Sequence, residues 1–177
     1  YKTGGRAVSL PEVYHGLQLQ LVLYLAAAVA KGGKPAGVFY FAIDDPLVPT
    51  SSRDRAEIEA LRDKELKLDG LVLDDPRVIT AMSPNPEAVL GVNPSRRSKN
   101  QIEEQDFQLL MDRAARLATD ALLRIRGGET AIRPASLADS SACDYCDYRP
   151  ICQVAPGIPG SEGIKLQKLS KGDVINH

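Results

Sequence analysis

The sequence predicts an α/β domain that carries helical additions and ends in a cysteine-rich segment. Apolar residues recur at helical spacing within residues 13–31, and residues 37–43 (GVFYFAI) then form a short, continuous run of β-branched and aromatic side chains. A helix followed by such a strand is typical of layered α/β folds. The three cysteines of the chain all lie within residues 143–152. We therefore expect an α/β layer structure followed by a distinct cysteine segment.

The first half of the chain is predicted to alternate short elements with loops. Gly4-Gly5 breaks the chain after a strand end, and Gly32-Gly33 ends a helix over residues 13–31. Residues 37–43 are expected to form a strand with both faces covered. Three further elements are expected: a charged helix over residues 55–67, an apolar patch over residues 71–73 and a helical turn over residues 78–82.

One long helix, predicted over residues 101–126, dominates the second half. Asn100 and Glu103 are spaced as in a capping box, and Gly127-Gly128 ends the helix. Residues 83–99 contain three prolines and little periodicity, so we expect a mobile loop there. A single apolar stripe should face a core, and it consists of Phe107, Leu110, Met111, Ala114, Ala118, Ala121, Leu122 and Ile125.

Charge and hydropathy limit the possible classes of function. The 22 basic and 23 acidic residues nearly cancel, so binding of a nucleic acid has to rely on local patches. The longest apolar run, residues 21–30, is far shorter than the roughly 20 residues of a membrane span, and we expect no membrane partner. An odd number of closely spaced cysteines argues against a secreted disulfide framework. It favours a metal site in a reducing compartment, the cytoplasm.

The cysteines have the spacing C-x2-C-x5-C, formed by Cys143, Cys146 and Cys152. Two cysteines three residues apart can hold one metal ion or one face of a cluster. Free thiols and a structural zinc site are the alternatives, and zinc needs a fourth ligand, for which His15 and His177 are the only histidines. We prefer an iron–sulfur cluster with a fourth thiolate from upstream of Tyr1, although spacing alone does not decide between zinc and iron.

Two further features carry chemistry only in combination. Lys2 lies in a predicted strand end, where a single lysine is usually a solvated side chain. Gln20 and Tyr24 are four residues apart and therefore share one face of the predicted helix. By itself, such a pair is more often a tyrosine at the edge of the core beside a polar neighbour. Their order and distance along the chain, with the cysteines at the other end, point to a common site.

These residues resemble the motifs of a known enzyme family. Residues Tyr1-Lys2-Thr3-Gly4 resemble the end of the D-Y-K-[ST]-G strand motif of RecB-type PD-(D/E)XK nucleases, and Gln20-x3-Tyr24 resembles their Q-x3-Y helix motif. Residues 142–152 (ACDYCDYRPIC) look like the C-terminal cysteine motif of the iron–sulfur branch. Together the motifs are most similar to the nuclease domain of the B subunits of AddAB/RexAB-type ATP-dependent helicase–deoxyribonucleases. CRISPR-associated nucleases with a similar cysteine tail are the nearest alternative group.

The resemblance implies a fold and a division of the chain. It implies part of a PD-(D/E)XK, or restriction-endonuclease-like, core with helical insertions over residues 1–135. Residues 136–177 would form the iron–sulfur cysteine motif and a C-terminal tail.

The resemblance also implies roles for individual residues. In this family one or two Mg²⁺ ions, held by carboxylates, generate the attacking hydroxide. Lys2 would orient the attacking water or neutralise charge on the phosphate, and Gln20 and Tyr24 would lie beside the active site. The three cysteines would be three of the four ligands of a structural [4Fe–4S] cluster. We also expect DNA as the substrate and a helicase–nuclease A subunit as the partner.

The chain departs from the family pattern in what it lacks. The carboxylate of the D-Y-K motif, the earlier metal-binding aspartate and the fourth cysteine are expected upstream of Tyr1. We therefore expect a fragment of a Mg²⁺-dependent DNA exonuclease domain, acting in double-strand break repair and recombination, that is inactive alone. A non-catalytic, metal-stapled module that binds DNA ends or a partner subunit is the main alternative. A small zinc-binding interaction domain is a third.

Overall fold

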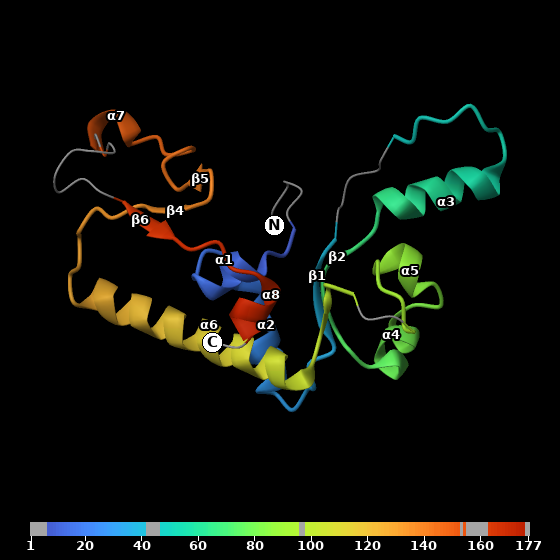
Figure 1. Cartoon of the computed structure of the whole chain (residues 1–177), viewed down its shortest axis with the longest axis horizontal. Coiled ribbons are helices and arrows are strands. Elements are labelled where there is room, and N and C mark those ends of the chain that lie inside the picture. The colour runs from blue at the N-terminus through green and yellow to red at the C-terminus, as the bar shows by residue number, and fades with distance from the viewer. Residues whose placement is uncertain (1–6, 42–46, 96–97, 153, 155–162, 176–177) are drawn as a thin grey trace.

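The computed structural model describes residues 7–41, 47–95, 98–152, 154 and 163–175. The described residues form helices and two small three-stranded sheets, which confirms the α/β class. Figure 1 shows that the two sheets lie apart. The long helix α6 (Glu104–Arg126) begins beside one sheet and extends toward the other. One sheet is the centre of a buried core, and the other belongs to the cysteine segment.

The central sheet has the order β1-β2-β3. Strand β1 (Gly37–Tyr40) pairs antiparallel with β2 (Asp69–Leu73), and β2 pairs parallel with β3 (Gln101–Ile102). Gly70 faces Phe39 across the first pair, and a Cβ atom there would lie 2.0 Å from the carbonyl oxygen of Val38. The close approach of β1 to β2 therefore requires glycine at this position.

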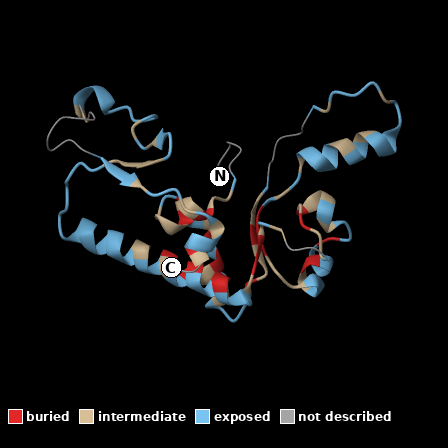
Figure 2. Cartoon of the chain, viewed as in Figure 1, coloured by how far each residue is buried: buried red, intermediate tan, exposed pale blue. Residues whose placement is uncertain are grey.

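Apolar side chains cover both faces of this sheet, as predicted. The strand predicted over residues 37–43 is shorter in the structure: it ends at Tyr40, Phe41 is 66% exposed, and residues 42–43 lie outside the described part of the chain. On one face, Val38, Leu71 and Ile102 belong to a core cluster that includes residues of α2 (Gln20–Val29) and α6. On the other face, Val72 packs with residues that follow β2; these are Ile79, Leu90 and Val92. The buried residues in Figure 2 accordingly gather around the central sheet and the helices next to it.

The predicted helix over residues 13–31 is wrong in its continuity. The structure has α1 (Leu10–Tyr14) and α2, separated by a turn. Gly16 adopts a φ of 83°, and the amide of Leu17 donates to the carbonyl oxygen of Glu12 at 2.8 Å, which closes the end of α1. A left-handed residue at this point is the usual device that terminates a helix. Apolar spacing continues across the turn, so periodicity alone did not reveal it.

Three helices between β1 and β3 begin with side-chain caps. They are α3 (Arg55–Glu65), capped by Asp54, α4 (Pro76–Met82), capped by Asp75, and α5 (Pro86–Val89), capped by Asn85. The expectation of a mobile loop over residues 83–99 is wrong for its described part. That part contains α5, and Leu90 and Val92 are 3% and 1% exposed because they pack beneath β2.

The long helix α6 starts later than predicted. Gln101 and Ile102 pair with β2 as strand β3, so the chain is still extended where the helix was expected to begin. The N-cap residue is Glu103, without a side-chain cap, and the proposed capping box of Asn100 with Glu103 is wrong. The apolar stripe is buried only in the first half of α6, where it consists of Phe107, Leu110, Met111 and Ala114.

The chain returns to the core after the cysteine segment. Strand β4 (Ala135–Leu137) lies between β5 (Ser140–Ser141) and β6 (Ile164–Leu166), and α7 (Arg149–Cys152) lies between β5 and β6 in sequence. The final helix, α8 (Lys171–Ile175), packs on α1 and places Val174 in the main core cluster. Among the described residues, no helix combines the length and apolar character needed to cross a membrane.

Candidate functional site

Gln20 and Tyr24 lie together on the outer face of α2. The amide nitrogen of Gln20 donates to the hydroxyl oxygen of Tyr24 at 2.9 Å, which confirms that the two residues share one helix face. Tyr24 is 63% exposed, whereas Val22 and Leu25 on the opposite side of the helix are buried. The pair is therefore held by the helix but remains accessible to a ligand.

Lys2 lies outside the described residues, which begin at Ala7. Residues 7–9, where the described part of the chain begins, are fixed by two side chains. Gln18 accepts a hydrogen bond from the amide of Ser9 and donates one to the carbonyl oxygen of Ala7, both at 2.9 Å. Asp69, at the start of β2, accepts from the amide of Val8 at 2.9 Å. The motifs did not indicate either residue; a glutamine between Leu17 and Leu19 in an apolar stretch was the available signal.

Two of the described aspartates near the central sheet are engaged in contacts within the protein. Asp75 caps α4 and pairs with Arg77, whose hydrogen bond lowers the pKa of this carboxyl from 3.8 to about 2. Asp74 accepts a hydrogen bond from the side-chain amide of Gln101 at 3.3 Å. Within the part of the chain that the structure describes, no three His, Cys, Asp or Glu side chains gather as a metal-binding group. No metal-dependent step is therefore assigned to these carboxylates.

The three cysteines are free thiols in one short segment. Cys146 donates its backbone amide to the carbonyl oxygen of Cys143 at 3.4 Å, so the first two lie in a turn. Cys152 ends α7, and its amide donates to the carbonyl oxygen of Tyr148 at 2.8 Å. Cys143 and Cys152 are partly exposed and Cys146 is exposed. The donor chemistry fits an iron–sulfur group, because free thiols at this spacing are its usual ligands, but these three described side chains do not gather into one metal-binding group.

The surroundings of the cysteines are open. Tyr145, Tyr148 and Ile151 are 94%, 72% and 81% exposed. This cluster of exposed apolar and aromatic side chains is in the same segment as the thiols, and nothing within the described residues covers it. The sheet β5-β4-β6 joins the core through the end of α6 on one side and through α8 on the other.

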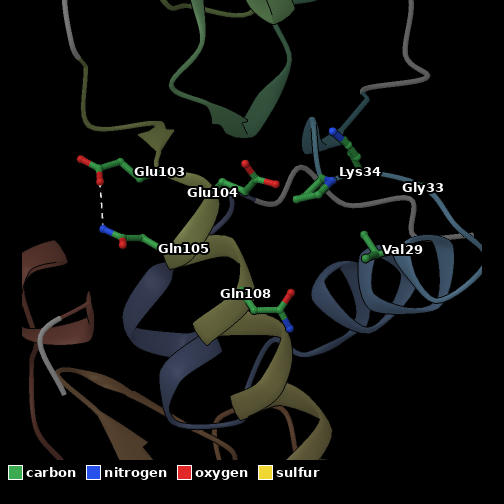
Figure 3. A pocket seen from close by; sticks show the side chains of 8 residues that line it. Val29, Gly33, Lys34, Glu103, Glu104, Gln105 and Gln108 are labelled. Atoms are coloured by element: carbon green, nitrogen blue, oxygen red, sulfur yellow. Dashed lines mark hydrogen bonds between the residues drawn. The ribbon is translucent and has the colours of Figure 1, made fainter.

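A wide groove lies at the start of α6, away from these residues. It has a volume of about 670 Å³ and is lined by the end of α2, the connection to β1 and the first turns of α6. Figure 3 shows Lys34 on one side and Glu103 and Glu104 on the other, with Gln105 donating a hydrogen bond to Glu103 at 3.0 Å. Neither the Gln20–Tyr24 pair nor any cysteine lines this groove. The candidate site and this groove are thus separate features.

Comparison with known proteins defines the class. Residues 1–153 match the PD-(D/E)XK nuclease superfamily, and the chain belongs to this family. The match includes Lys2, the Gln20–Tyr24 pair and all three cysteines. The family is the one that the sequence motifs indicated.

Individual relatives share one name. The chain is 32% identical over 190 residues to the ATP-dependent helicase/deoxyribonuclease B subunit of Alkaliphilus metalliredigens, covering 99% of this chain and 16% of that protein. It is 36% identical to the proteins of the same name from Symbiobacterium thermophilum and Moorella thermoacetica, covering 98% and 96% of this chain and 16% of each relative. The chain therefore spans about a sixth of the length of these relatives.

Proposed function

We propose that this chain is part of a Mg²⁺-dependent DNA exonuclease domain within a helicase–nuclease that acts in double-strand break repair and recombination. The observation that carries the proposal is the superfamily match over residues 1–153, which contains all three motifs. The relatives described above are named as the B subunit of a helicase/deoxyribonuclease, and this name supports DNA as the substrate and an A subunit as the partner. We place this complex in the cytoplasm.

In this proposal Lys2 orients the attacking water or neutralises the charge that develops on the scissile phosphate. Gln20 and Tyr24 contact DNA beside it. The hydroxyl oxygen of Tyr24 accepts the hydrogen bond from Gln20, so its own hydrogen can be donated to an acceptor such as a phosphate oxygen. The exposure of Tyr24 supports this role. The motifs that resemble the family include no residue of this sequence that would be a magnesium ligand. We therefore predict that residues 1–177 alone do not cleave DNA.

The cysteines form the second part of the proposal. Cys143, Cys146 and Cys152 would supply three of the four thiolates of a [4Fe–4S] cluster, and the fourth would come from elsewhere in the full-length protein. The group would serve to tie the cysteine segment to the nuclease core, without a redox role. Iron with acid-labile sulfide in the purified protein would support it, and zinc would contradict it.

The test uses the full-length protein that contains this sequence, purified without oxygen. Mg²⁺-dependent release of nucleotides from linear DNA is compared for the wild type, Lys2→Ala and Tyr24→Phe, with the exposed Lys31→Ala as the matched control. We expect Lys2→Ala to lower the rate on the order of 10²- to 10³-fold, as the loss of one charge-stabilising donor does. Tyr24→Phe should lower it less, and Lys31→Ala should leave it unchanged.

The outcomes separate the alternatives. Cleavage that is unaffected by Lys2→Ala would mean that Lys2 is not in the active site and that the motif assignment is wrong. Absence of cleavage by the wild type, with iron bound and DNA ends retained in a filter-binding assay, would instead favour the non-catalytic DNA-end or partner-binding module.

A further inference from the structure

The apolar face of α6 continues past the point where the core ends. Four side chains in the second half of the helix follow the buried Ala114 at helical spacing, so they lie on the side of α6 that packs in the core. They are Ala118, Ala121, Leu122 and Ile125, here called the exposed stripe. Leu122 and Ile125 are 56% and 72% exposed. The face that is buried over the first turns of α6 is therefore uncovered over its last turns.

The opposite side of the same turns provides a reference. Leu123 comes nine positions after Ala114, which places it across the helix from the exposed stripe, and it is 58% exposed. Its neighbours on that side are polar; they are Arg116, Thr119 and Asp120. A single apolar side chain on a polar surface is ordinary, whereas a continuous apolar row marks a surface that binds another group.

The elements that bury the first half of α6 do not reach the exposed stripe. Helices α1 and α2 pack on α6 and supply Val13, Val22 and Leu25 to the core cluster. Figure 1 shows that α6 extends past α1 and α8 toward the cysteine segment. The packed face of α6 thus has room for one more element in line with those that already cover it.

The size of the exposed stripe indicates which kind of occupant it fits. From Ala118 to Ile125 it spans about 10 Å, because an α-helix rises about 1.5 Å per residue. Its four side chains, two of them alanines, expose far less than the roughly 800 Å² that each partner buries in a stable complex of separate molecules. A segment of the same polypeptide can bind so small a surface, because the chain itself holds it close and it loses less freedom on binding.

The relatives have the additional polypeptide that such a segment requires. The matched part is 16% of each of the three relatives described above, so most of each protein lies outside it. The cluster proposed above also takes its fourth thiolate from elsewhere in the full-length protein. That part of the polypeptide has to reach the cysteine segment, which is the direction in which the exposed stripe extends.

We propose that the exposed stripe of α6 is a docking surface for a short apolar segment of the same polypeptide that lies outside residues 1–177. The segment continues the core along α6, and about two turns of helix suffice to cover the stripe. The inference goes beyond the proposed function and rests on one part of it, that the chain belongs to a protein as long as these relatives.

The experiment is photo-cross-linking in the full-length protein, alone and with the A subunit. Photoreactive p-benzoylphenylalanine replaces Ile125 or, as the matched control, Leu123 on the opposite side of the helix. Irradiated samples are digested, and mass spectrometry identifies the peptides joined to each position. A mixture of isotope-labelled and unlabelled protein distinguishes links within one molecule from links between two copies. We expect position 125 to form links within one molecule, to peptides outside residues 1–177, and position 123 to lack them.

A second measurement reports the contribution of the contact to local stability. Hydrogen exchange of the backbone amides of residues 118–126 is compared in the full-length protein for the wild type, Ile125→Asp and Leu123→Asp. A charge on the covered side expels the docked segment, so exchange should become faster in Ile125→Asp. The same charge on the opposite side stays in water and should leave the exchange rates close to those of the wild type.

Four results would overturn the inference: links from position 125 only to the A subunit, only to a second copy, or to no peptide outside residues 1–177, or equal exchange rates in the two aspartate variants. Release of nucleotides from linear DNA is measured on the same preparations. An active protein without the expected links would remove this inference and retain the nuclease proposal. The expected links in a protein that does not cleave DNA would retain the docking surface and remove the nuclease proposal.

Discussion

The two halves of α6 have the same apolar periodicity but different surroundings. In the first half, Phe107 and Ala114 are each 1% exposed. In the second half, Leu122, Leu123 and Ile125 are 56%, 58% and 72% exposed. Figure 2 shows the change along one continuous helix, from buried residues beside the central sheet to exposed ones toward the cysteine segment.

The difference shows what covers each half. The first half packs against residues from α1, α2 and the central sheet, among them Val13, Leu25 and Ile102. Tyr14 of α1 adds a polar contact, because the Arg113 side chain donates to its carbonyl oxygen at 2.7 Å and lies over its ring. The second half extends beyond these elements. A helix stripe therefore predicts a face that can be buried, and other parts of the chain determine how far burial extends.

The largest expected effect comes from the buried half. Phe107→Ala should lower the free energy of unfolding by about 3–5 kcal/mol, because it removes a large side chain from a packed core. Leu122→Ala, in the exposed half of the same helix, should change it by no more than about 0.5 kcal/mol. Urea denaturation of the two variants of residues 1–177 measures both values. A similar loss in both would mean that the second half is also buried and would break the comparison.

A smaller effect is expected where the C-terminal helix returns to the core. Val174 is 7% exposed and packs in the same cluster as Phe107. Val174→Ala removes two buried methyl groups and should lower the free energy of unfolding by about 1–2 kcal/mol. Ile164→Ala, in the half-exposed strand β6, is the control. An effect of the control as large as that of Val174→Ala would show that the cysteine segment is more tightly packed than the exposed fractions indicate.

The smallest effect concerns the end of α6. Glu129 bonds Arg124 and Arg133, and these hydrogen bonds lower its pKa from 4.5 to about 2, with Arg124 as the larger cause. Because the folded state favours the carboxylate, the contribution of Glu129 to stability is present above pH 4.5 and is lost as the pH falls toward 2. Arg124→Gln should raise the pKa of Glu129 toward 4.5, which NMR titration of the carboxyl carbon measures. An unchanged pKa would show that the ion pair does not form in solution.

The sequence predicted those features that depend on short-range patterns. The strand around Val38, the charged helix after Asp54 and most of α6 follow from residue type and spacing, and the structure confirms them. The break at Gly16 and the burial of Leu90 and Val92 depend on a left-handed turn and on packing against β2. Neither contributes a periodic signal, so both predictions failed at these points.

The candidate site was predictable to a similar extent. The shared face of Gln20 and Tyr24 follows from a spacing of four residues, and their hydrogen bond confirms it. The roles of these residues, of Lys2 and of the cysteines remain predictions that the proposed experiments address. The hydrogen bonds by which Gln18 and Asp69 hold residues 7–9 were not predictable. The two side chains come from a turn and from a strand 51 residues later in the sequence.

The return of α8 has a consequence for how the cysteine segment is attached. Lys171 donates to the carbonyl oxygen of Gln101 at 2.5 Å, His15 contacts the carbonyl oxygen of Gln167 at 2.8 Å, and Val174 is buried in the core. These contacts bring the two ends of the chain between Gln101 and Lys171 together, so about seventy residues form a loop that is closed by non-covalent contacts. Closing a loop lowers the conformational entropy of the chain within it, as a cross-link does. The cysteine segment is therefore attached to the core at two points, and it is not a free tail.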